Sequence, residues 1–161
     1  AIGYNCSSFI NPGSDYKVFK DIVKYVHDAG NGTGPIEEVG HQQNYKVGVL
    51  MGIMTVEAIT KATEIYGNKP MSGEQVRDGI ENLDINEERL KEMGIEGFIP
   101  TFKISCSDHE GNAPVKFQTW NGKSFEPASD WISTDQSIVR PMIEASAATY
   151  AAEKGLSSAC N

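Results

Sequence analysis

A run of apolar residues with no polar face dominates the middle of this chain. Residues 47–56 place Val, Leu, Ile and Met side chains all round a helix, so that helix needs cover on every side. We expect it to span residues 44–66, buried in its first half and amphipathic in its second. Gly48 and Gly52 share one face, and each costs about 1 kcal/mol of helix propensity, so we expect another backbone to pack closely there.

Composition limits the kind of protein this can be. The chain has 161 residues, 39% of them apolar, which is enough for one core of ordinary size. A net charge of −8 and an isoelectric point near 4.8 leave no basic surface for phosphates, so we expect no nucleic-acid partner. The apolar run is far shorter than the ~20 residues of a membrane-spanning helix, and we expect a soluble chain.

The N-terminal third predicts a strand followed by a helix. Residues 4–10 form a short strand pattern that the turn residues 11–13 interrupt. The apolar stripe of the next helix runs until Gly30, and either Ser14 or Asp15 can cap its start.

Later segments carry clearer local signals. Ser72 with Gln75 three residues on is a capping box for a helix over 72–83, and Asn86 can cap a shorter helix over 87–93. Asn121-Gly122 between two strand patterns predicts a hairpin with a type I′ turn. Residues 135–154 predict a C-terminal helix, with Pro141 near its first turn or at a kink and Gly155 as its stop.

Signatures of catalysis and of metal binding are absent from the sequence. It has no nucleophile elbow, no phosphate-binding glycine loop and no two cysteines at metal-ligand spacing, so we expect no enzyme, no metal and no cofactor. His109 with Cys106 or Asp108 is an alternative catalytic group. Neighbours in a turn point in different directions, which favours a structural turn in which Asp108 binds local amides and Gly111 takes a special backbone angle.

The start of the long helix is the best candidate for binding. Free amides at a helix N-terminus favour an anion such as a carboxylate, and Gln43, Asn44 and Tyr45 would add directional hydrogen bonds and an aromatic wall. His41 precedes them and could face either solvent or a cleft. The alternative is that Asn44 caps the helix and Tyr45 packs in the core.

The order of elements in the second half resembles a known family. Residues 102–131 run from a strand through the turn Asp108-His109-Glu110-Gly111 to a second strand, a hairpin and Asp130-Trp131. This resembles the closing segment of the type I periplasmic solute-binding proteins, the branched-chain amino acid receptors that deliver ligand to an ABC transporter. The helices expected over 47–67 and 72–83 are similar to the two that precede this segment, and 131–156 to the family's C-terminal tail.

The resemblance implies a part of a two-lobed α/β receptor. Residues 1–12 would supply a second-lobe strand and hinge, 13–100 first-lobe helices, and 101–161 the hinge return, the second-lobe hairpin and the terminal helix. The chain covers less than half of such a receptor. The implied hinge residues are Phe9, Ile10, Asp108, His109 and Gly111.

The resemblance also implies function and partners. The receptor would bind an amino acid or another small carboxylate or amide between its lobes and deliver it to an ABC transporter permease in the membrane. It would be periplasmic, with a signal peptide in the full-length precursor. If both strands that enter the hinge lie side by side, Cys6 and Cys106 could form a disulfide; the alternative is two buried thiols.

A free-standing interaction module is the rival interpretation. A helix that is apolar all round, beside so few strands, leaves surface uncovered. We therefore expect this chain to self-associate when it is produced alone.

Overall fold

Helical segments outweigh short strands in the computed structural model, which describes residues 1–112, 114–157 and 160. The helical elements are α1 (Lys17–Ile22), the π-helical η1 (Val23–His27), the 3-10 turn η2 (Ile36–Glu38), α2 (Gln43–Tyr66), α3 (Gly73–Ile80), α4 (Glu87–Glu92) and α5 (Gln136–Lys154). The strands are β1 (Asn5–Ser8), β2 (Asp84–Ile85), β3 (Phe102–Lys103), β4 (Lys116–Trp120) and β5 (Phe125–Pro127). The expected α/β class, with a helix-rich middle, a C-terminal hairpin and a terminal helix, is confirmed.

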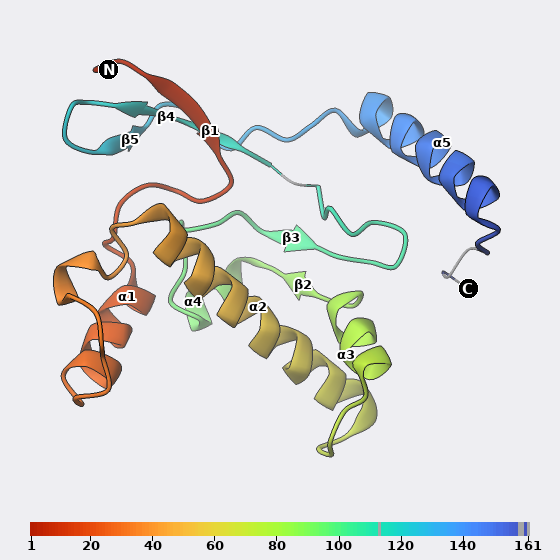
Figure 1. Ribbon diagram of the computed structural model, residues 1–161, viewed down its shortest axis with the longest axis horizontal. Coiled ribbons are helices and arrows are strands. Elements are labelled where there is room, and N and C mark those ends of the chain that lie inside the picture. Colours follow the sequence, from red (N-terminus) through yellow and green to blue (C-terminus); the bar gives the residue numbers. More distant parts are fainter. Residues whose placement is uncertain (113, 158–159, 161) are drawn as a thin grey trace.

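The elements form two parts and an outlying helix. Figure 1 shows the antiparallel sheet β1-β4-β5 on one side of a helical body that contains α1 to α4 and the small pair β2-β3. The chain passes from the sheet to the body after β1 and returns to it between β3 and β4. Helix α5 lies beside the connection from β3 to β4, where Arg140 pairs with Asp108 and Glu110, and none of its described residues is buried.

The sheet joins segments that lie far apart in the sequence. β1 pairs with β4 so that Cys6 lies opposite Gln118 and Ser8 opposite Lys116. At the exit from β1, the Ser8 hydroxyl donates to Ile10 O over 2.7 Å and accepts from Ile10 N over 3.1 Å. This local pair of hydrogen bonds directs Ile10, which is 1% exposed, into the core of the helical body.

The hairpin is present, but its turn differs from the expected type. Trp120 pairs with Phe125, so the loop has the residues 121–124, and Asn121 N donates to Ser124 O over 3.0 Å. A type I′ turn needs positive φ at two residues, whereas only Gly122 has it here, at 102°. The Asn121 carboxamide oxygen accepts from Lys123 N and Ser124 N, each over 2.8 Å, and these bonds hold the longer loop.

Helix α2 is not buried all round, which corrects the expectation from its composition. One face packs inward, with Ala58 1% and Ala62 0% exposed, but Met51 is 61% and Val56 60% exposed. The tight helix contact lies at Gly79 of α3, where an added methyl would lie 2.2 Å from Ala58 O. Apart from the nearby backbone of α2 itself, no described atom would come within 4 Å of a methyl added at Gly48 or Gly52.

The core of the body is built around aromatic rings. Phe19 of α1 lies 5.4 Å from Phe98 between ring centroids, and Tyr16 lies 5.1 Å from Phe98. Tyr16 is also the N-cap of α1, so the expected caps Ser14 and Asp15 are wrong. The backbone carbonyl of Gly94 takes the role of a capping side chain, because it accepts a hydrogen bond from Val18 N in the first turn of α1 over 3.0 Å.

Other expected helix ends are confirmed. Ser72 and Gln75 form the capping box of α3, and the Asn86 side chain accepts from Arg89 N over 2.9 Å at the start of α4. Gly155 ends α5 in the left-handed conformation, with φ 63°. Pro141 lies inside α5, beyond its first turn.

Within the described residues, no helix is long and apolar enough to cross a membrane.

The disulfide differs from the expected one. Cys106 is bonded to Cys160, whereas Cys6 is free and its Sγ accepts from Gln118 Nε2 over 3.3 Å. The expected pairing of Cys6 with Cys106 is wrong because β1 pairs with β4 rather than with the segment that holds Cys106.

Peptide mapping tests this pairing. Digestion of the unreduced, alkylated protein should yield Cys6 in an alkylated peptide and Cys106 linked to the peptide that contains Cys160. A linked peptide that contains Cys6 would contradict this arrangement.

The exposed face of α2 predicts self-association of the isolated chain. Val56→Lys should lower the association measured by light scattering across a concentration series, because it places a charge among exposed apolar side chains. Asn68→Lys adds the same charge just beyond the helix and should leave association unchanged. A concentration-independent monomer mass for the unmodified chain would count against this expectation.

Candidate functional site

Three hollows in the surface could hold a small molecule. The first is the acidic groove, of about 340 Å³, between α2 and the segment from β2 to α4. The second is the sheet–helix cleft, of about 760 Å³, between the sheet and the start of α2. The third, of about 580 Å³, lies along β2, β3 and the turn that contains Asp108 and Gly111. The first two differ in whether their cations are already paired.

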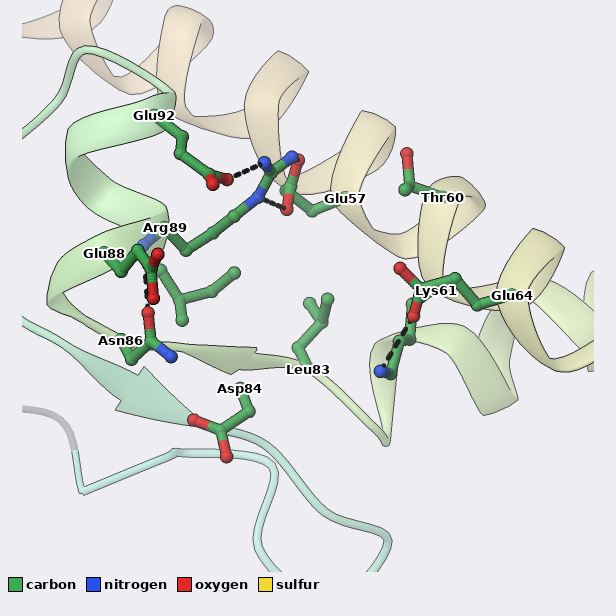
Figure 2. A pocket seen from close by; sticks show the side chains of 11 residues that line it. Glu57, Thr60, Lys61, Glu64, Leu83, Asp84, Asn86, Glu88, Arg89 and Glu92 are labelled. Atoms are coloured by element: carbon green, nitrogen blue, oxygen red, sulfur yellow. Dashed lines mark hydrogen bonds and ion pairs between the residues drawn. The ribbon is translucent and has the colours of Figure 1, made fainter.

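The cations of the acidic groove, Arg89 and Lys61, are both paired with carboxylates of the same groove. Figure 2 shows Arg89 reaching from α4 to Glu57 on α2. Its Nε and Nη2 donate to the two carboxylate oxygens of Glu57 over 2.7 and 2.6 Å, and Nη1 donates to Glu92 over 2.6 Å. The hydrogen bonds from Arg89 to Glu57 and Glu92 raise the pKa of its guanidinium. This groove therefore ties two helices together and offers no unpaired cation to a ligand.

The sheet–helix cleft takes its walls from both parts of the molecule. The sheet supplies residues of β1, β4 and the hairpin, and the body supplies the approach to α2 and its first turn. The lining residues are Cys6, Ser7, Ser8, Phe9, Pro12, Gly13, His41, Gln43, Lys46, Gln118, Trp120, Lys123, Ser124 and Phe125.

Packing around Phe19 fixes the start of α2 beside this cleft. A methyl added at Gly40 would lie 2.7 Å from the Phe19 ring, and Gly40 has φ 74°, so glycine suits this position on both counts. Tyr45 also contacts the Phe19 ring, with centroids 6.4 Å apart. The Ser14 hydroxyl lies 3.3 Å from His41 Nε2, which joins the approach to α2 to the segment after β1.

Lys46 is the unusual residue of the cleft. Lys46 as a whole residue is only 4% exposed, and this burial lowers the pKa of its ammonium group. In the part of the chain that the structure describes, no hydrogen bond or ion pair reaches this ammonium. Gln42, the N-cap of α2, makes no side-chain capping bond, so the first-turn amides are open as well.

The expected binding residues divide into two groups. His41 and Gln43 line the cleft, whereas Asn44 and Tyr45 do not. Asn44 is exposed in the first turn of α2 and does not cap it, because Gln42 is the N-cap. Tyr45 packs against the core through Phe19, which was the alternative interpretation. Their roles in binding stay predictions.

Lys46 was missed by the sequence interpretation. A signal was present, because a lysine immediately precedes a helix segment in which nearly every side chain is apolar. Such a position has apolar neighbours on its own face, and a charge there is desolvated unless it has a partner.

The expected hinge residues lie on the two connections between sheet and body. Phe9 is 53% exposed and Ile10 is buried on the first connection. On the second, Asp108 Oδ1 accepts from Gly111 N over 3.2 Å, and Gly111 has φ 60°, as the turn pattern predicted. His109 Nε2 lies 3.4 Å from Glu81 Oε1. Whether these residues move on ligand binding stays a prediction.

The alternative catalytic group lacks its nucleophile in this structure. Cys106 is bonded to Cys160 and has no thiol to ionise. The described residues also contain no group of three or more His, Cys, Asp or Glu side chains that could hold a metal ion.

Comparisons with solved structures bear on the fold. The whole chain is similar to 39% of a crystal structure described as an ABC transporter permease from the Pseudomonas fluorescens group, at 36% identity and a TM-score of 0.93. It is similar over 84% of its length to 34% of a branched-chain amino acid ABC transporter from Thermus thermophilus with bound valine, at 19% identity and a TM-score of 0.62. No protein-family model and no curated protein matches the sequence. The chain thus has the fold of a part of these proteins and spans about two fifths of the first and a third of the second.

The paired charges of the acidic groove predict a stability effect. Arg89→Met should lower the free energy of unfolding by about 2–3 kcal/mol, because it leaves the nearly buried Glu57 carboxylate without a partner. The expected loss of stability is smaller than for breaking a fully buried ion pair, because the Arg89 side chain is 37% exposed.

The matched control is Arg77→Met, whose ion pair with Glu81 is longer, at 3.6 Å, and more exposed. It should change stability by no more than about 0.5 kcal/mol in urea denaturation. Equal effects of the two variants would contradict this assignment.

Proposed function

We propose that this chain is part of the solute-binding component of an ABC transporter, which holds a small ligand such as an amino acid, a carboxylate or an amide between two lobes. The observation that carries this proposal is the sheet–helix cleft. In the described part of the chain, its two walls belong to parts of the molecule that are joined by two backbone connections. Relative motion of such parts is a common way to close a site over a ligand.

The comparisons support the same proposal. The Thermus thermophilus protein whose fold this chain shares in part holds valine, and both similar structures are described as parts of ABC transporters. Because the chain spans well under half of either protein, we propose that further residues complete the site in the whole receptor. We also propose that the protein belongs to the type I periplasmic binding proteins.

Location and partners follow from the proposed role. We place the protein outside the cytoplasm, where a disulfide such as Cys106–Cys160 is stable, with a membrane permease as its partner. The binding cycle makes and breaks no covalent bond, so we propose that the protein is not an enzyme.

A stand-alone interaction module is the second candidate. The observation in its favour is the exposed face of α2, where Met51, Val56 and Ile59 are each at least 45% exposed. Such a face suits contact with another protein surface. The two candidates differ in whether a small molecule enters the sheet–helix cleft.

Tryptophan fluorescence tests the proposed function. Trp120 lines the cleft, and Trp131→Phe leaves it as the one tryptophan of the chain. Titration with amino acids, small aromatic acids and ureas should give a saturable change in its emission with at least one class. The matched control, Trp120→Phe, keeps Trp131 and should give no such change. An unchanged Trp120 signal with every compound, in this chain and in a longer receptor, would contradict a solute-binding role.

A further inference from the structure

Lys46 poses an electrostatic problem that the chain itself does not solve. The residue is 4% exposed, and burial is the only cause that lowers its pKa, so no carboxylate of the described chain offsets the loss of water. The other buried charge of α2, Glu57, is 8% exposed and has a bidentate partner in Arg89. Among the described residues, Asn11 Oδ1 and not Lys46 Nζ is the buried side-chain atom without a partner, so the Lys46 ammonium still reaches the cleft. A largely desolvated cation without a partner in the chain favours an anion from outside it.

The charge of the cleft is opposite to that of the protein. The chain carries 22 acidic and 14 basic side chains, yet none of the lining residues is Asp or Glu. Lys46 lies in the wall, and Lys123 and His41 line the cleft at exposed positions. An anion entering this cleft therefore meets cationic groups and no carboxylate of the lining.

The start of α2 adds to this attraction. The first-turn amides of α2 have no side-chain cap, and the positive end of the helix dipole lies on the same wall as Lys46. Unlike a bare helix N-terminus, this one stands beside the ammonium of a nearly buried lysine, which has no partner among the described residues. Together the two features suit a single anionic group.

The side chains of the opposite wall indicate the chemical character of the rest of the ligand. Trp120 and Phe125 line the cleft with ring centroids 5.2 Å apart, and Phe9 lies on the same lining. These rings suit an apolar or aromatic body rather than a phosphate, which needs several donors and gains nothing from aromatic contact. The cleft has about 760 Å³, which is ample for a molecule of this kind.

We propose that the sheet–helix cleft selects a small organic carboxylate with an apolar or aromatic body, and that Lys46 is the residue that pairs with its carboxylate. This inference rests on the proposed function and names the ligand class and a specificity residue for it. A neutral amide of the same shape lacks the charge that Lys46 requires, and a cationic amine is repelled.

Titrations of the chain with benzoate, benzamide, benzylamine and inorganic phosphate test the proposal. Benzoate should bind, raise the pKa of Lys46 in a carbon-13 NMR titration of its Cε, and bind more tightly than the other three probes. Lys46→Met should weaken benzoate binding by about 10- to 100-fold, the size expected for loss of a charged hydrogen bond. It should also leave the melting temperature of the empty protein unchanged or higher, because it removes an unpaired buried charge.

Lys61→Met is the matched control, since Lys61 lies on the same helix, outside this cleft, and pairs with Glu64. It should bind benzoate like the unmodified chain. Equal affinity for benzoate and benzamide, preference for phosphate, unchanged affinity in Lys46→Met, or no benzoate binding would each overturn the proposal. If amino acids or ureas still changed Trp120 fluorescence in any of these cases, the proposed solute-binding function would stand, and the proposed selection of carboxylates by Lys46 would fall.

Discussion

The antiparallel pairing of β1 with β4 is the contact on which the rest of the arrangement depends. It places Cys6 opposite Gln118, although most of the chain separates them in sequence, and so brings the first strand and the hairpin into one sheet. Because β1 leads directly into the helical body and β4 follows the return connection, this pairing sets the sheet opposite the start of α2. The sheet–helix cleft exists only because these distant segments meet.

Charge placement then separates the acidic groove from the sheet–helix cleft. In the acidic groove, Arg89 binds Glu57 and Glu92, and the resulting network holds α4 against α2 (Figure 2). In the cleft, Lys46 is buried without such a partner. A satisfied network stabilises a fold, whereas an unsatisfied buried charge favours binding of a group with the opposite charge. This contrast is our reason for placing function in the cleft.

Local patterns predicted local structure well, and contacts between distant residues poorly. The capping box at Ser72 and the hairpin at Gly122 follow from interactions within a few residues, and both are present. The disulfide partner of Cys106, the exposure of Val56 and the burial of Lys46 depend on which distant segments meet. Composition alone also overstated the cover of α2, because it does not show which faces of a helix meet other segments.

The central claim is that ligand enters between the sheet and the start of α2. The most direct measurement is a map of amide chemical-shift changes in nitrogen-15 NMR as a bound solute is titrated into the isolated chain. We predict changes at β1, at the β4–β5 hairpin and in the first turn of α2, with none in the acidic groove. Changes centred on the acidic groove, or on the exposed face around Val56, would contradict the account.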